Sequence, residues 1–249
     1  MHGIAVPDAV LTTAPAALLH THGEDNDWLG LGSIDLLVVH AARPIAAGLD
    51  HHYAHGLSWK CEHRSIREIE AAAEGLSSAG DVLPTHLDLL NRIMNAEPLL
   101  GEDWHRGLKE RLRDSALREL TLGQYVGLAR TAIGNTTALL TRCHALDAAL
   151  SARDALNATV DALLTGAGHR VASGARRRDA FTRLTESGDP LGCLLTLERY
   201  QRIQTMQGLH VGDAEAWTGS VLSLCLTILL ALEAQDSLPD LVLHLESTS

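Results

Sequence analysis

Apolar residues recur every three or four positions from His20 to the end of the chain, which is the spacing of helices with one buried face. Alanine and leucine dominate these segments, and the alternation of β-branched and polar residues that marks strands is scarce. Glycine and proline residues separate the periodic stretches. Helices are expected over residues 33–56, 62–76, 85–96, 102–119, 122–145, 147–176, 190–206 and 213–234. The pattern therefore predicts an all-α bundle.

Neither an internal repeat nor a linker rich in proline, glycine and serine divides the sequence. We therefore expect residues 1–249 to form a single domain. The first 20 residues are rich in alanine, threonine and proline, and a loosely ordered N-terminal arm is expected there. The longest apolar stretch, Val221 to Leu232, is shorter than the ~20 residues that span a bilayer. It is interpreted as a buried core helix, so a membrane span is not expected.

The amino-acid composition limits the kinds of molecule that the chain is expected to bind. The chain has 20 lysine and arginine residues against 31 aspartate and glutamate residues, a formal net charge of −11, and 46% hydrophobic residues. This is enough apolar material for a core. The chain is too acidic for a general nucleic-acid surface, since Lys60 and Lys109 are its only lysines. Four widely spaced cysteines without a CxxC pair, and an N-terminus without the basic region of a secretory signal, indicate the cytoplasm.

Histidines cluster between residues 50 and 63. His51 and His55 are four residues apart, which on a helix places two imidazoles on one face, and Cys61 and His63 follow closely. These side chains are suited to ligate a transition metal in a helical bundle. The other interpretation is that they are helix-end histidines without a ligand.

Arg130 lies in an otherwise apolar helix, between Leu128 and Ile133. A buried guanidinium requires an anion, which is either a ligand or the partner of a structural ion pair. Gly134 then offers a point at which the helix can bend and expose carbonyl groups.

A third segment carries His169, Ser173 and Arg177 at intervals of four, with Arg176 adjacent. This spacing places an imidazole, a hydroxyl and a guanidinium on one helix face. The basic run at residues 176–178 suits a single phosphate-bearing ligand. A solvated helix surface is the alternative interpretation of that run.

In their order and internal spacing, these three segments resemble the bacterial class I terpene synthases. The α-helical barrel of that family carries an aspartate-rich DDxxD motif, an arginine that senses the substrate diphosphate, and an NDxxSxxKE motif. Asp50 matches the first aspartate, and His51 stands in place of the second. Tyr125, Arg130 and Gly134 match the segment that holds the sensor arginine and the glycine bend.

The NDxxSxxKE motif is matched with His169 at the asparagine, Ser173 at the serine, Arg176 at the lysine and Arg177 at the glutamate. In the family, such side chains and the aspartates hold Mg²⁺ ions that bind the diphosphate. Arg177 carries a fixed positive charge instead, and two like charges about 4 Å apart at an effective dielectric of about 20 repel by about 4 kcal/mol. A trinuclear magnesium site is therefore not expected, and Mg²⁺ is disfavoured as a cofactor.

The resemblance covers residues 35–235 and implies a single-domain helical bundle of the class I terpenoid synthase type. It implies a divergent cyclase or lyase of natural-product biosynthesis, acting on an isoprenoid or similar apolar substrate such as a prenyl diphosphate. The expected catalytic residues are Asp50, His51, His169 and Ser173. The expected substrate-binding residues are Tyr125, Arg130, Gly134, Arg176 and Arg177. Weak candidates for a metal ligand are Asp50, His51 and His55.

Two alternatives to a divergent enzyme stay open. The first is a non-catalytic relative that binds an apolar ligand or partners an active synthase. The second is the transition-metal site formed by His51, His55, Cys61 and His63. A homodimer is compatible with the expected fold in each case.

Overall fold

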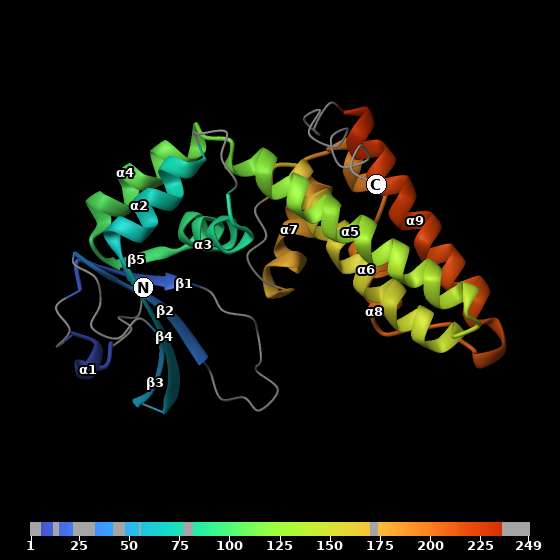
Figure 1. Cartoon of the computed structure of the whole chain (residues 1–249), viewed down its shortest axis with the longest axis horizontal. Coiled ribbons are helices and arrows are strands. Elements are labelled where there is room, and N and C mark those ends of the chain that lie inside the picture. The colour runs from blue at the N-terminus through green and yellow to red at the C-terminus, as the bar shows by residue number, and fades with distance from the viewer. Residues whose placement is uncertain are drawn as a thin grey trace. The chain divides into compact units, whose positions relative to one another are not determined.

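The computed structural model describes residues 6–11, 15–21, 33–41, 48–54, 56–76, 82–169 and 174–235. The chain divides into two compact units (Figure 1). Unit 1 comprises residues 1–117 and 172–175, and unit 2 comprises residues 118–171 and 176–249. The expectation of a single domain over residues 1–249 stays a prediction.

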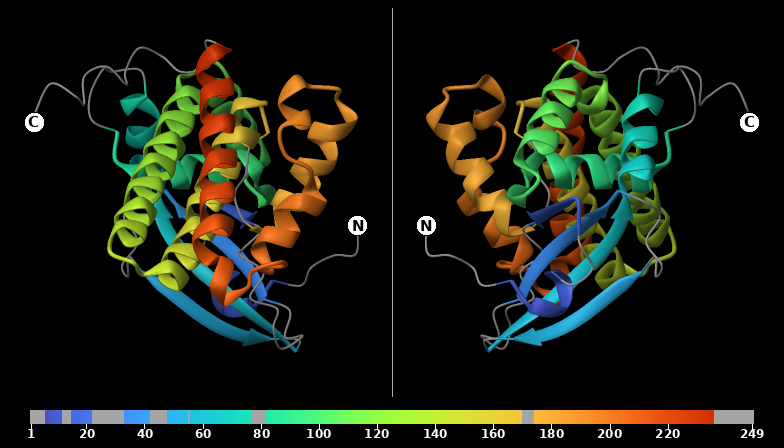
Figure 2. Two further views of the ribbon diagram at one scale, coloured as in Figure 1. Left: turned by 90° about the vertical axis from the view of Figure 1, so that its right-hand side faces the viewer. Right: turned by 90° about the vertical axis from the view of Figure 1, so that its left-hand side faces the viewer.

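A mixed sheet of five described strands forms the centre of unit 1. The strands are β1 (Ala17–Thr21), β2 (Ser33–His40), β3 (Leu49–Ala54), β4 (Leu57–Ser65) and β5 (Glu97–Leu100), and their order across the sheet is β3-β4-β2-β1-β5. β2 and β4 are parallel, from Ser33 opposite Ser58 to His40 opposite Ser65, and the other neighbouring strands are antiparallel. Two turned views show how the strands twist relative to one another (Figure 2).

The two faces of this sheet are covered by different elements. The helices of unit 1 are α1 (Asp8–Leu11), α2 (Ile66–Gly75), α3 (Pro84–Asn95) and α4 (Glu102–Arg113). On one face, which we call the α1 face, Leu36, Val38, Trp59 and Cys61 are buried with Val10 of α1. The next residues along each strand point to the opposite face. We call this the helix face, because α2, α3 and α4 lie over it (Figure 1).

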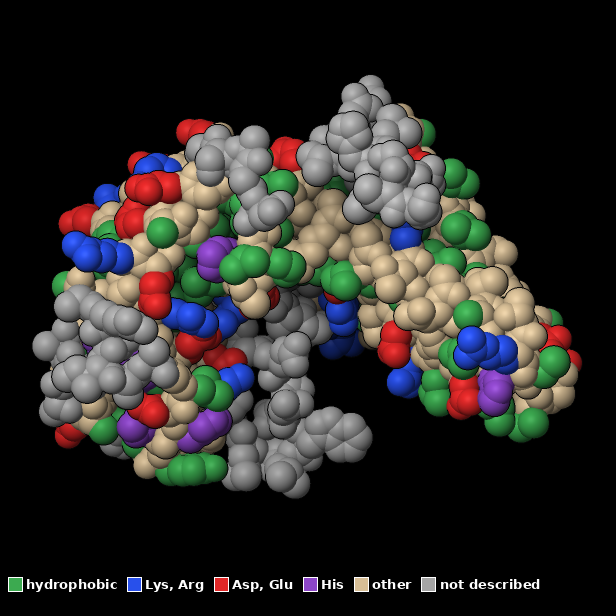
Figure 3. Space-filling view, in the orientation of Figure 1, with side chains coloured by type: hydrophobic (Ala, Val, Ile, Leu, Met, Phe, Trp, Pro, Cys, Tyr) green, Lys and Arg blue, Asp and Glu red, His purple; other side chains and the backbone are tan. Residues whose placement is uncertain are grey.

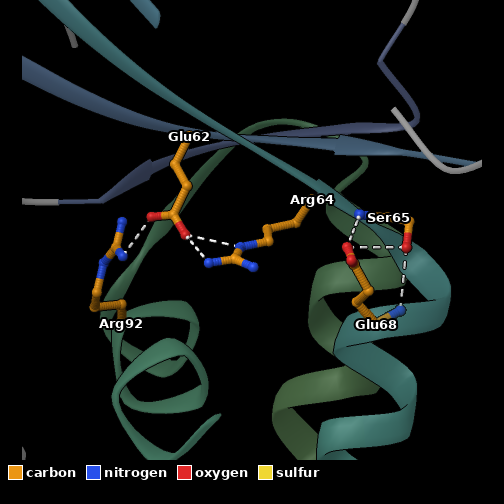
Figure 4. Close-up of polar contacts among 5 residues, drawn as sticks. All are labelled: Glu62, Arg64, Ser65, Glu68 and Arg92. Carbon is orange, nitrogen blue, oxygen red and sulfur yellow. Dashed lines mark hydrogen bonds and ion pairs between the residues drawn. The ribbon is translucent and has the colours of Figure 1, made fainter. Parts of the chain in front are cut away.

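The junction between β4 and α2 is fixed by a capping box (Figure 4). The backbone N–H of Glu68 donates to Oγ of Ser65 at 3.2 Å, and the backbone N–H of Ser65 donates to the Glu68 carboxylate at 2.9 Å. These two hydrogen bonds satisfy donors that a helix N-terminus otherwise leaves free. The strand therefore ends, and the helix begins, at Ser65.

Gly101 joins β5 to α4 in a left-handed conformation with φ of 77°. A Cβ at this position would lie 2.6 Å from the Cβ of Ala17 and 2.8 Å from the carbonyl oxygen of Ala16. We expect Gly101→Ala to lower the free energy of unfolding of unit 1 by about 2–4 kcal/mol, through backbone strain and overpacking. Urea denaturation followed by circular dichroism measures this loss.

Gly107→Ala is the matched control for this prediction. Gly107 lies within α4, and a Cβ there would meet no atom within 4 Å. Because alanine favours a helix over glycine by about 1 kcal/mol, this variant is expected to be as stable as the wild type or more stable. Equal behaviour of the two variants would contradict the strained role assigned to Gly101.

Unit 2 is helical in its described part. Its helices are α5 (Leu117–Thr141), α6 (Ala145–Gly166), α7 (Gly174–Glu186), α8 (Leu197–Gln204) and α9 (Ala214–Ala234), with short 3₁₀ turns η2 (Pro190–Cys193) and η3 (Val211–Asp213). α6 and α9 pack closely, since a Cβ on Gly166 would clash with Cδ2 of Leu232. The core of unit 2 includes Leu156, Leu163 and Ile228, all fully buried.

The expectation of an all-α fold is wrong, because unit 1 contains a sheet. Residues 33–56, expected as one helix, contain β2 and β3, and residues 62–76 are divided between β4 and α2. Residues 17–20 of the expected N-terminal arm belong to β1, which lies between β2 and β5. The helices expected over residues 85–96 and 213–234 are confirmed within one residue, as α3 and α9.

Among the described helices, the segment Val211–Ala234 has the length and apolar composition needed to cross a membrane. The α9 part of this segment buries Cys225, Ile228 and Leu232 completely. Leu226 and Leu230 of the same helix are 48% and 64% exposed. The space-filling view shows hydrophobic and charged side chains on the surfaces of both units (Figure 3).

Candidate functional site

Asp50 and His51, both expected at a catalytic helix end, lie in strand β3. Asp50 is opposite Cys61 and His51 is opposite Lys60 in the antiparallel pair with β4. Successive residues of a strand point to opposite faces, so Asp50 lies on the α1 face and His51 on the helix face. The helical spacing of four residues that linked His51 with His55 does not exist here, and His55 lies outside the described residues.

The transition-metal set of His51, His55, Cys61 and His63 is not assembled by this sheet. Cys61 and His63 lie on the α1 face, opposite to His51. Burial raises the pKa of the Cys61 thiol to about 11, and the charges of Asp50 and Asp35 add to this rise. The described residues contain no group of three or more histidine, cysteine, aspartate or glutamate side chains placed to hold a metal ion.

Arg130 and Gly134, expected as a ligand sensor and a helix bend, both lie in α5 of unit 2. Arg130 is exposed on α5, and its guanidinium forms an ion pair with Glu233 of α9. Gly134 lies within α5, which continues as a helix to Thr141. Tyr125 of the same helix is half-buried against the core of unit 2. The structure therefore gives Arg130 the structural ion pair that the sequence left open.

Arg177 forms a bidentate ion pair within unit 2. Its Nε and Nη2 donate to the two carboxylate oxygens of Asp161, each at 2.8 Å. Hydrogen bonding to Asp161 raises the pKa of Arg177, so the guanidinium stays charged. The side chains are 22% and 13% exposed, respectively. Arg177 thus joins α7 to α6, which explains its charge without a diphosphate ligand.

His169 and Arg177, expected on one helix face, do not lie on the same helix. α6 ends at Gly166 and α7 begins at Gly174, so His169 follows one helix and Arg177 lies in the next. Burial lowers the pKa of His169, and the charge of Arg183 lowers it further. Ser173 and the side chain of Arg176 lie outside the described part of the structure.

Charged residues that the sequence reading did not select lie on the helix face of unit 1. Asp35 of β2 is opposite Lys60 of β4, and Glu62 is two residues further along β4. Residues opposite each other in a parallel pair share a face, as do residues two apart in a strand. Lys60 is exposed, and Asp35 and Glu62 are half-buried. We call Asp35, Lys60 and Glu62 the charged group.

Glu62 is held between two arginines (Figure 4). Its carboxylate accepts from Nη1 of Arg92, on α3, at 2.6 Å and from Nε of Arg64 at 2.8 Å. Burial raises the pKa of Glu62, but the charges and hydrogen bonds of Arg92 and Arg64 outweigh it, and the pKa is lowered. Glu62 is therefore an oriented carboxylate that stays ionised at neutral pH.

A second polar group lies on the α1 face. Nε2 of His40 and Nδ1 of His63 are 2.9 Å apart, and their rings are tilted by 17°. Nε2 of His63 is 3.4 Å from a carboxylate oxygen of Asp50. His63 is 7% exposed and Asp50 is 54% exposed. The three side chains thus form a chain from the edge strand β3, through β4, to the last residue of β2.

The charged group and the histidine group could have been found from residues 57–65, whose side chains alternate between the two faces of the sheet. Trp59, Cys61 and His63 point to the α1 face, and Lys60 and Glu62 point to the helix face. A period of two is typical of a strand. The sequence analysis selected Cys61 and His63 from this segment as metal ligands beside an expected helix, so it missed Asp35, Lys60, Glu62 and the contact of His63 with His40.

Comparisons with known proteins assign no family. No family model matches the chain, and no curated protein matches it. Among solved structures, the chain is similar to a nucleotidyltransferase-like protein from Exiguobacterium sibiricum 255-15. The two are 12% identical with a TM-score of 0.49, over 86% of this chain and 68% of that chain. A likeness at this level defines neither the family nor the activity of the present chain.

The resemblance to terpene synthases is wrong, and the cyclase or lyase expected from it is not supported. The family is all-helical, whereas Asp50 and His51 lie in a sheet. Asp50 belongs to unit 1 and Arg177 to unit 2, where Asp161 neutralises it. The non-catalytic relative of a terpene synthase falls with the same observation. The matched residues are therefore short coincidences of type and spacing.

Proposed function

We propose that unit 1 binds a phosphorylated small molecule at the charged group, and that nucleotides are the class to test first. The observation that supports this proposal is that two carboxylate residues and one exposed lysine share one face of two neighbouring strands. Asp35, Lys60 and Glu62 share one face of the parallel strands β2 and β4. An ammonium is a suitable point charge for phosphate oxygens.

Lys60 has the properties of a ligand-binding cation. It is exposed, and none of the ion pairs between described residues uses it. Arg92 and Arg64, by contrast, are already paired with Glu62. A phosphate that approaches this face therefore finds one lysine available, next to carboxylates that would repel it unless a cation is present.

Asp35 and Glu62 fit a divalent cation that arrives with the ligand. Mg²⁺ is commonly bound by one or two carboxylates together with substrate phosphates, and it keeps several waters. The ionised state of Glu62 meets this need, although its two arginine partners compete for the same oxygens. When bound, Mg²⁺ would neutralise phosphate charge beside the two carboxylates. The proposal places the protein in the cytoplasm, where nucleotides and Mg²⁺ occur together.

Calorimetric titration with ATP, GTP, CTP and UTP, each with and without Mg²⁺, tests the proposal. The wild type is expected to bind at least one of these nucleotides, and more tightly with Mg²⁺. Asp35→Asn is expected to weaken binding about tenfold when Mg²⁺ is present, because it removes an anionic ligand. Lys60→Met is expected to weaken binding about tenfold with or without Mg²⁺.

Asp103→Asn serves as the control, since the Asp103 side chain on α4 is 97% exposed and lies outside the charged group. It should bind as the wild type does. Binding that is equal in Asp35→Asn, Lys60→Met and the wild type would refute the role of the charged group. Failure of every nucleotide to bind would refute the proposed ligand class.

A further inference from the structure

We propose that Asp50, His63 and His40 on the α1 face form a proton relay, in which Nδ1 of His40 is the base that accepts a proton from a hydroxyl group of a small molecule or from water. This site lies on the opposite face of the sheet from the charged group. It does not depend on nucleotide binding there.

The contact between the two imidazoles has the geometry of a hydrogen bond. The nitrogens are 2.9 Å apart, with ring centroids separated by 5.2 Å and a tilt of 17°. Rings stacked face to face would not bring two nitrogens so close, so the contact joins ring edges. A neutral imidazole has one N–H and one lone pair. One ring therefore donates through this contact, and the other accepts.

Asp50 determines which ring donates. Nε2 of His63 is buried and has no hydrogen-bond partner among the described residues, and an Asp50 carboxylate oxygen lies 3.4 Å from it, within ion-pair range. An ionised carboxylate at that position favours the tautomer of His63 with hydrogen on Nε2. Nδ1 of His63 then accepts from the Nε2–H of His40, and Nδ1 of His40 keeps its lone pair. Asp50 and His63 are positioning residues that act through His40.

The proton can be followed through this chain. When Nδ1 of His40 accepts a proton from a hydroxyl group, the oxygen keeps the electron pair and His40 becomes an imidazolium. Transfer of the Nε2 proton of His40 to Nδ1 of His63 then leaves His40 neutral. The positive charge then rests on His63, next to the Asp50 carboxylate. Each step moves one proton, and no oxidant or reductant is required.

The location of His40 is suited to ligand access. It is the last residue of β2 and lies opposite Ser65, at the carboxyl end of the parallel pair. Ligands of open α/β sheets bind outside the carboxyl ends of strands. His40 is half-buried, whereas His63 is almost completely buried. His40 is therefore the member of the pair with surface open to solvent, whereas His63 has almost none.

The charge state of His40 matches the role of a base. Burial lowers its pKa, and the charge of His63 lowers it further, so the neutral form prevails at pH 7. Among the described residues, the other titratable groups on this face are Cys61 of β4, whose pKa is raised, His52 of β3 and His20 of β1, and α1 carries Asp8 in its first turn. The lowered pKa of His40 has burial and the charge of His63 as its causes, and none of these other groups.

A structural histidine pair would have the same coordinates, so the test must report reactivity. Diethyl pyrocarbonate attacks unprotonated, accessible imidazole nitrogens, and peptide mass spectrometry resolves the rate at each histidine of the full chain. At pH 7 we expect His40 to react about fivefold faster than His51, an exposed histidine of β3 outside the relay. Nitrogen NMR should show His40 with hydrogen on Nε2.

Asp50→Asn is expected to lower the rate at His40 by about fivefold, because an amide no longer fixes the tautomer of His63. The rate at His51 in the same sample should not change. Asp50 is exposed, so this variant is expected to fold, and circular dichroism checks it. Asp103→Asn is the control that should leave both rates unchanged. A His40 with hydrogen on Nδ1, or a His40 rate that is insensitive to Asp50→Asn, would overturn the relay.

Discussion

Asp161→Ala is expected to lower the free energy of unfolding of unit 2 by about 3 kcal/mol. The change leaves the guanidinium of Arg177, with a side chain only 22% exposed, without its bidentate partner between α6 and α7. Loss of one member of a buried ion pair costs about 3–5 kcal/mol, and partial exposure of Arg177 places the expected loss at the lower end. Urea denaturation followed by circular dichroism at 222 nm, which is a helix signal, measures the change.

Asp103→Ala is the matched comparison for this prediction. Asp103 also pairs with an arginine, with Nη2 of Arg106 at 2.7 Å, but its side chain is 97% exposed. Exposed pairs contribute less than about 1 kcal/mol because water screens them. The difference between the two losses of unfolding free energy therefore measures how much burial strengthens the Arg177–Asp161 ion pair. Similar losses in both would contradict the structural role given to Arg177.

Trp59→Ala is expected to lower the free energy of unfolding of unit 1 by about 3–5 kcal/mol, the usual cost of removing a large buried ring. Trp59 is fully buried between β4 and α1, and its Nε1–H donates to the carbonyl oxygen of Ala54 at 3.2 Å. The substitution removes this hydrogen bond and leaves a cavity under the β3–β4 hairpin. Thermal and urea unfolding of the full chain measure the loss.

Tyr53→Ala provides the control in the same hairpin. Tyr53 is 83% exposed and lies opposite Ser58, next to the Trp59 pair. Replacement of an exposed side chain usually changes stability by less than about 0.5 kcal/mol. If Trp59→Ala were no more destabilising than Tyr53→Ala, the α1 face would not be the packed core that the structure describes.

Two helices were predicted well, for different reasons. The α3 segment has a one-sided apolar pattern with a helical period, whereas α9 is a long apolar run that is hydrophobic on its exposed side too, at Leu226 and Leu230, and both were expected within one residue. β2 was missed for a physical reason. Leu36, Leu37, Val38 and Val39 are all completely buried, since both faces of this central strand are covered. A strand buried on both faces is an unbroken apolar run, which periodicity does not distinguish from a buried helix.

The spacing of residues along the chain could not predict which residues the charged and histidine side chains contact. The sequence predicted a buried Arg130 with an anionic partner, whereas Arg130 is exposed and pairs with Glu233, which lies 103 residues away. Similarly, the contact between His40 and His63 joins residues 23 apart, through the register of two parallel strands. Such pairs depend on which strand lies beside which, and local pattern does not contain that information.

The position of β3 at one end of the strand order affects how unit 1 behaves at high concentration. An edge strand has backbone donors and acceptors along its outer side, and these can pair with a strand of another chain. β3 is polar for most of its length, with Asp50, His51 and His52 in sequence. Polar and ionisable side chains on an edge discourage such pairing. Asp50 and His51, which were first considered for catalysis, therefore protect the sheet against intermolecular aggregation together with His52.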